Sequence, residues 1–115
     1  MDQEERMRIW DIPAEKLCRN HLLGEHRELH AIWSILTKGK KGYAHHPETR
    51  RWAGKRKALY LRHQDLIQEM VHRGYKHHSP LDARLANGDN EQTEFLDPPE
   101  KQAKILRKKR CGCRA

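Results

Sequence analysis

Three polar residues, His21, Glu25 and Glu28, stand at helical spacing inside the segment HLLGEHRELHAIWSIL, residues 21–36. Steps of four and three residues place their side chains in one sector about 60° wide, because each residue turns an α-helix by about 100°. This sector borders the apolar stripe of the same helix, which carries Leu22, Leu29, Trp33 and Leu36. Two carboxylates and an imidazole beside a core are costly unless they are paired or used.

The polar sector allows three interpretations. The first is a network in which each glutamate pairs with an arginine or histidine and does no chemistry. The second is a metal site, because histidine and carboxylates on one helix face are common ligands, although the usual Glu-His and His-His spacings are missing. The third is acid–base or electrostatic catalysis by one carboxylate, whose pKa would be tuned by burial beside Leu29 and Trp33.

Two histidine pairs, His45-His46 and His77-His78, stand in predicted loops beside proline or serine. Adjacent residues in an extended chain point to opposite sides, so each pair could offer one ring to a ligand and one to solvent. Loop capping and hydrogen bonding is the simpler interpretation. Phosphate contact, or a metal held between the two loops, is the alternative.

The composition favours a polyanionic partner. The chain has 115 residues, a formal net charge of +8 and a pI of about 9.7. Charged residues make up 35% against 36% hydrophobic, and the mean hydropathy is −1.10, which predicts one domain with a small core. Such a charge favours nucleic acid before membrane.

Neither a membrane span nor a disulfide framework is expected. The sequence has no run of about 18 apolar residues and no apolar signal segment near its start. Cys18, Cys111 and Cys113 are odd in number and lack the Cys-x-x-Cys spacing, which argues against a disulfide framework or a zinc knuckle. We therefore expect a cytoplasmic protein, and we expect it to be a monomer.

Basic residues gather in three runs, and backbone phosphates are their expected partners. The runs are Lys38, Lys40 and Lys41, then Arg50, Arg51, Lys55, Arg56 and Lys57, and finally residues 101–110. A charge run is often only a solvated face. From the first two runs we assign DNA contacts to Lys40, Lys41, Arg51 and Lys55.

An all-α scaffold is predicted to position these residues. Residues 8–12 are expected to be extended. A first helix should run from the Asp11/Pro13 region to about Thr37 and stop at Lys38-Gly39. A second long helix should open at Pro47, with a possible break near Gly54, and end before Gly74. A short turn after residues 79–80 and a last helix from residue 97 complete a small bundle of two long and one or two short helices. We divide the chain into an extension (1–6), a helical domain (7–96) and a basic helix and tail (97–115).

Two motifs resemble a known family. Met7-Arg8-Ile9, followed fourteen positions after Met7 by HLLGEHREL, resembles the opening of the pyrimidine-dimer DNA glycosylases of the phage endonuclease V type. The segment LRHQDLIQEMVHRGYKHHS, residues 61–79, is similar to that family's long second helix. Together the matches cover about residues 7–79.

The resemblance implies an all-α fold with its N-terminal segment packed between the helices. It also implies a combined DNA glycosylase and abasic-site lyase, in which the α-amine of Met7 attacks C1′ of the damaged nucleotide. The base leaves, a Schiff base forms, and β-elimination cuts the strand. This chemistry implies that no metal and no cofactor are needed. An α-amine has a pKa near 8, so it is partly neutral and nucleophilic at working pH, and nearby cations lower that pKa further. Glu28 matches the catalytic glutamate, which would stabilise the cationic sugar and assist proton transfer.

The implied partner is double-stranded DNA that contains damaged bases or abasic sites. Arg8 and Arg27 match positions that hold phosphates, and we add His21 and His30 to the DNA-contacting set. The sequence departs from the family at Met7, where the family has a small residue, and at Ala31, where it has an arginine. The native chain could begin at Met1 or at Met7, and only a free amine at Met7 suits the mechanism. A non-catalytic nucleic-acid-binding module of the same fold, and a metalloprotein built on His and Glu, remain alternatives.

Overall fold

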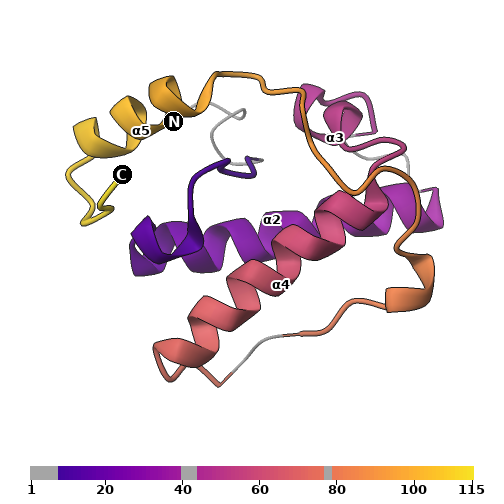
Figure 1. Cartoon of the computed structure of the whole chain (residues 1–115), viewed down its shortest axis with the longest axis horizontal. Helices are drawn as coiled ribbons and strands as arrows, with labels where there is room; N and C mark the ends of the chain where they lie inside the picture. Colours follow the sequence, from indigo (N-terminus) through magenta and orange to yellow (C-terminus); the bar gives the residue numbers. More distant parts are fainter. Residues whose placement is uncertain (1–7, 40–43, 77–78) are drawn as a thin grey trace.

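Two long helices, α2 (Arg19–Lys38) and α4 (Arg56–His72), cross against each other and form the frame of the molecule (Figure 1). The computed structural model describes residues 8–39, 44–76 and 79–115. Two short helices, α3 (Pro47–Arg51) and α5 (Pro99–Lys108), and two 3-10 turns, η1 (Ala14–Lys16) and η2 (Ala83–Leu85), complete it. No strand occurs among these residues, so the predicted all-α bundle of two long and two short helices is confirmed.

The core lies where the apolar stripe of α2 meets α4. Its fully buried side chains come from both helices, namely Leu22, Leu29 and Ile32 from α2 and Leu59, Leu66 and Met70 from α4. Each such side chain contributes roughly 1.5–3 kcal/mol relative to an exposed one. Among the described residues, no helix is both long enough and apolar enough to span a bilayer.

The extended N-terminal segment packs inside the helices, between α2 and the two short helices (Figure 1). Ile9, Trp10 and Ile12 are 1%, 3% and 6% exposed. Its backbone is bonded on three sides: the Trp10 N–H donates to Glu25 on α2, the Ile9 carbonyl accepts from Arg51 on α3, and the Asp11 N–H donates to Gln102 on α5. The segment is therefore part of the core.

The first long helix begins later than the sequence predicts. Residues 14–16 form only the 3-10 turn η1, and α2 starts at Arg19 after an extended Cys18. Carbonyls that an α-helix would use are taken by residues from elsewhere: Arg73 donates to Leu17 at 2.6 Å, and the Arg114 N–H donates to the carbonyl of Lys16 at 2.7 Å. The predicted start near Pro13 was therefore wrong. The predicted end at Lys38-Gly39 is confirmed.

The second predicted helix breaks at Gly54, which adopts φ +76°, and this divides it into α3 and α4. The start of α4 lacks a side-chain cap. The N–H groups of Lys57 and Ala58 instead donate to the carbonyls of Asn87 and Asp89, at 2.8 and 3.0 Å. The segment that follows η2 therefore caps α4 before it leads to α5.

Candidate functional site

The two carboxylates of the α2 polar sector lie in different environments. Glu25 is 2% exposed and accepts hydrogen bonds from the Trp10 N–H at 3.0 Å and from Arg62 on α4 at 2.6 and 3.0 Å. Burial raises the pKa of Glu25, and the positive charge of Arg62 opposes that rise. A two-point contact with a guanidinium is among the strongest hydrogen-bonded pairs in proteins. Glu25 thus fixes the N-terminal segment and α4 to α2.

Glu28 lies one turn further along α2 and is only partly buried. Loss of solvent raises its pKa, and the neighbouring charge of Arg27 opposes this. Within the described residues Glu28 makes no ion pair. A carboxyl group that has a raised pKa and is partly exposed to solvent can exchange a proton with a ligand. Of the two glutamates, Glu28 is therefore the one available for chemistry.

Met7, the predicted nucleophile, lies outside the described residues. Arg8, beside it, forms an ion pair with Asp97 just before α5, and its guanidinium lies 4.9 Å from the ring centre of Trp10. Arg8 is thus held at the junction of the N-terminal segment and the C-terminal part. Asp97 has a lowered pKa because Lys101 and Arg8 both donate hydrogen bonds to it.

The residues predicted to contact DNA fall into three groups. Arg27 is exposed on α2, while Lys40 and Lys41 lie outside the described residues. Arg51 is 5% exposed and is occupied by Glu48, Asp11 and two backbone carbonyls. The ammonium of Lys55 lies 2.7 Å from Gln92 and 3.3 Å from Glu94. The charges of Arg51 and Lys55 therefore hold the fold together from inside.

His30 belongs to a group of three histidine rings that the sequence analysis did not bring together. His30 and His63 both donate from Nε2 to the carbonyl of Ser79, at 3.0 and 2.9 Å, and the His26 ring centre lies 4.7 Å from that of His30. Burial lowers the pKa of His30, the bond to Ser79 opposes this, and the charge of His63 adds to it. The group links α2, α4 and the segment after α4.

His46 behaves as the capping interpretation predicts. Its Nδ1 accepts from the Glu48 N–H at 3.0 Å, which caps the start of α3. His45 is exposed, and His77 and His78 lie outside the described residues.

His21 contacts the N-terminal segment and the C-terminal tail. Its ring packs edge-on against Trp10, with 5.6 Å between ring centres, and its Nδ1 lies 3.1 Å from Sγ of Cys18. Within the described residues, two groups bring possible metal-ligating atoms within 4.8 Å of one another: Cys18, His21, Cys111 and Cys113, and separately His26, His30 and His63. Neither group was predicted from the sequence. The intervals of four residues between His26 and His30 and of three between Cys18 and His21 are local signals, but His63 and the two tail cysteines come from distant parts of the chain.

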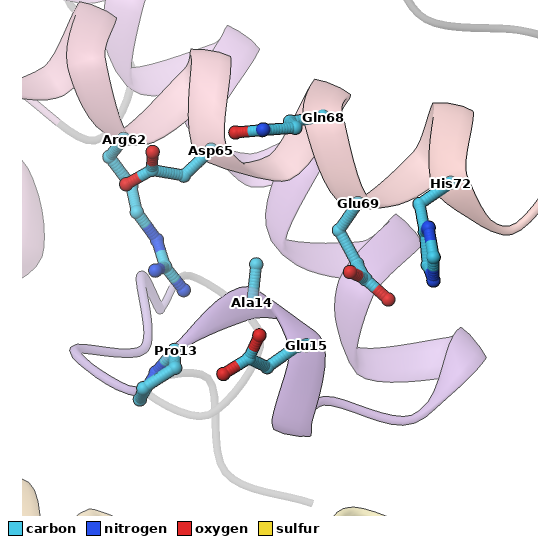
Figure 2. A pocket seen from close by; sticks show the side chains of 8 residues that line it. All are labelled: Pro13, Ala14, Glu15, Arg62, Asp65, Gln68, Glu69 and His72. Carbon is cyan, nitrogen blue, oxygen red and sulfur yellow. The ribbon is translucent and has the colours of Figure 1, made fainter.

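A cavity of about 430 Å³ opens between η1 and α4 (Figure 2), and among the described residues neither Glu25 nor Glu28 lines it. Figure 2 shows the carboxylate of Glu15 on η1 across from that of Glu69 on α4, with Asp65 on the same wall. Arg62 also lines it, but its guanidinium is bonded to Glu25. Three carboxylates repel a phosphate backbone, so this cavity does not suit DNA.

Comparison with a protein-family model agrees with the two motifs in residues 7–79. Residues 7–83 match the family model described as pyrimidine dimer DNA glycosylase. No curated protein and no solved structure matches the chain. The matched region contains the N-terminal segment, α2, α3 and α4, which together carry Glu25, Glu28 and their partners. The chain therefore belongs to the pyrimidine dimer DNA glycosylase family.

Proposed function

We propose that this protein is a DNA repair glycosylase with abasic-site lyase activity, acting on pyrimidine dimers through a Schiff base with the α-amine of Met7. The family supports the glycosylase step. Several features of the site support the lyase step and the roles of individual residues.

The bond between the Trp10 N–H and Glu25 is the observation that carries the proposal. Met7 stands three positions before Trp10, and an extended chain of that length spans at most about 10 Å. Glu28 is three residues beyond Glu25 on α2, about 4.5 Å along the helix axis. The amine of a chain that begins at Met7 would therefore lie within about 10 Å of the Trp10–Glu25 bond, one helical turn from Glu28.

Glu28 is the carboxylate for the chemical steps. In the glycosylase step its negative charge stabilises the cationic sugar as the base departs, and the amine forms the bond to C1′. In the lyase step it can take the proton whose loss allows β-elimination. Glu25 cannot share these tasks because Arg62 and Trp10 occupy its oxygens.

Duplex DNA that contains damaged pyrimidines is the proposed substrate. Arg27 is exposed beside Glu28 and can hold a phosphate close to the lesion. The net charge of +8 supplies the less specific attraction to the backbone. Extruding a nucleotide costs a few kcal/mol, and less at a damaged site, which favours lesions over intact DNA.

Borohydride trapping tests the nucleophile. Two chains, one beginning at Met7 and one at Met1, are incubated with duplex DNA that carries an abasic site, and the imine is reduced to a stable amine. The chain that begins at Met7 should become covalently attached, with the adduct on its α-amine in a peptide mass map. The chain that begins at Met1 should be trapped only after its first six residues are removed.

Two results would contradict the proposal. An adduct on a lysine side chain would move the nucleophile away from the N-terminus. Tight DNA binding without any adduct from the chain that begins at Met7 would favour the non-catalytic nucleic-acid-binding module.

A further inference from the structure

Four metal-ligating side chains from opposite ends of the chain meet beside the N-terminal segment. Cys18 is the N-cap of α2 and His21 lies in its first turn, while Cys111 and Cys113 follow α5 in the C-terminal tail. Their three sulfur atoms and one imidazole nitrogen all lie within 4.8 Å of one another. Nδ1 of His21 is 3.1 Å from Sγ of Cys18 and 3.5 Å from Sγ of Cys113. We propose that these four residues bind one zinc ion.

The spacing of the donor atoms fits a tetrahedral site. With zinc–sulfur bonds of about 2.3 Å and zinc–nitrogen bonds of about 2.0 Å, the edges of the tetrahedron are roughly 3.5–3.8 Å. The two sulfur–nitrogen distances lie close to that range, and the remaining pairs of donor atoms lie within 4.8 Å of one another. Three thiols and one imidazole are the donor set of many structural zinc sites. On binding, the thiols release their protons and His21 binds through Nδ1 with its proton on Nε2.

Backbone contacts already hold the four residues in place for zinc binding. The Cys18 N–H donates to Sγ of Cys113 at 3.0 Å, the kind of contact that stabilises a thiolate ligand. After α5 the tail turns back through Arg110 and Gly112, whose φ angles are +52° and +100°. The bond from the Arg114 N–H to the Lys16 carbonyl, at 2.7 Å, holds the returned tail against the start of α2.

The site is closed, which indicates a structural role. Four protein ligands leave no open position for water or substrate. The ion would join residues 18–21 to residues 111–113. Because such a site does not exist in the unfolded chain, the free energy of zinc binding would add to the stability of the folded state. His21 also packs against Trp10, so the metal would stiffen the support of the N-terminal segment. This gives the CGC tail a purpose that does not depend on the proposed chemistry.

The group of His26, His30 and His63 is a weaker metal site and provides a control. Nε2 of His30 and Nε2 of His63 both donate to the Ser79 carbonyl, so these atoms carry protons and cannot act as ligands in this arrangement. The group has no sulfur donor, which zinc favours in structural sites.

Metal analysis of the full, untagged chain tests the proposal. The chain is purified without chelator, dialysed against metal-free buffer and analysed by mass spectrometry for zinc, with an expected content of about one ion per chain. Cys113→Ser should retain less than about a tenth of that zinc, since three ligands hold the ion far less tightly. His30→Gln, which alters only the histidine group, should retain all of it. Cobalt in place of zinc should give the intense visible bands of a tetrahedral thiolate site in the wild-type chain and not in Cys113→Ser.

A second measurement does not depend on the variant folding. A mercurial reagent is titrated into the wild-type chain, and a coloured chelator reports the zinc that is released. We expect zinc to leave in step with modification of the three thiols. A chain that shows three free thiols and takes up no zinc, a native disulfide between any two of the cysteines, or zinc that is lost in His30→Gln and kept in Cys113→Ser would each overturn the site.

Discussion

The backbone N–H of Trp10 donates to Oε1 of Glu25 across 3.0 Å, and this one bond ties the extended N-terminal segment to the middle of α2. Arg62 reaches the same carboxylate from α4, so three parts of the chain meet at Glu25. Because the carboxylate is buried, loss of one partner leaves a polar or charged group without compensation.

Glu25→Gln should destabilise the fold. The amide can still accept from Trp10, but the Arg62 guanidinium, whose side chain is 13% exposed, then loses its counter-ion, which typically costs about 1–3 kcal/mol. Urea unfolding followed by circular dichroism measures the change. The double variant Glu25→Gln/Arg62→Met should regain part of the loss, because the buried charge is gone. A single variant as stable as the wild type would show that the pair contributes nothing.

Glu28→Gln should leave the stability of the fold almost unchanged and lower the activity. The side chain is partly exposed and, within the described residues, makes no ion pair, so thermal unfolding should stay close to that of the wild type. The release of damaged base and the cutting of the strand should each slow by about 100-fold or more, the usual contribution of a positioned acid or base. Affinity for DNA with an abasic site should be retained. Full lyase activity in this variant would remove Glu28 from the mechanism.

Local patterns predicted the helices of this protein well. The apolar stripe of α2, the stop at Gly39 and the break at Gly54 all follow from residue types and spacing, and the structure confirms each. The start of α2 could not be read in the same way. It depends on Arg73 and Arg114, which arrive from distant parts of the chain to bind the carbonyls of residues 14–17.

The candidate site could be predicted only in part, because its contacts also involve residues that are distant in the sequence. Spacing placed Glu25 and Glu28 in one sector but could not say that Arg62 would occupy Glu25 and leave Glu28 available. Basic runs suggested contacts for Arg51 and Lys55, and only the tertiary structure reveals that their charges are satisfied inside. The interval of three residues between Cys18 and His21 was the one local signal for the group that Cys111 and Cys113 complete.

Arg27→Gln should weaken binding to DNA of any sequence. Its exposed guanidinium is expected to contact a phosphate, so its removal should lower the slope of log affinity against log salt by about 1. Arg84→Gln is the matched control, because Arg84 in η2 is also exposed but pairs with Asp82, and it stands just beyond the matched residues 7–83. Fluorescence anisotropy across a salt series measures both. Equal salt slopes for the two variants would contradict a phosphate contact by Arg27.

His30 should make stability depend on pH. Its pKa is lowered from the ordinary value of 6.5, chiefly by burial, so the folded chain binds fewer protons than the unfolded chain just below pH 6.5. The neutral His30 ring therefore leaves the folded state at its full stability above pH 6.5. The free energy of unfolding decreases as the pH falls from 6.5 through the lowered pKa of His30. His30→Gln keeps a donor for the Ser79 carbonyl but cannot titrate, so its unfolding free energy should fall less steeply between about pH 7 and pH 5.5. Identical slopes for the variant and the wild type would exclude His30 as the cause.

Gly24→Ala should stabilise the protein. Gly24 lies in the interior of α2, and among the described residues no atom outside the helix backbone lies within 4 Å of a Cβ added there. Alanine in place of glycine inside a helix typically contributes about 0.5–1 kcal/mol. Gly88→Ala is the contrasting variant, because φ is +84° there and a Cβ would lie 2.2 Å from the carbonyl oxygen of Gly54, so it should destabilise. Unfolding curves compare the two. A Gly24→Ala variant that is more stable but cuts damaged DNA more slowly would show that the glycine allows close approach of the substrate beside Glu25 and Glu28. A variant that is less stable than the wild type would contradict the open space that the geometry indicates at Gly24.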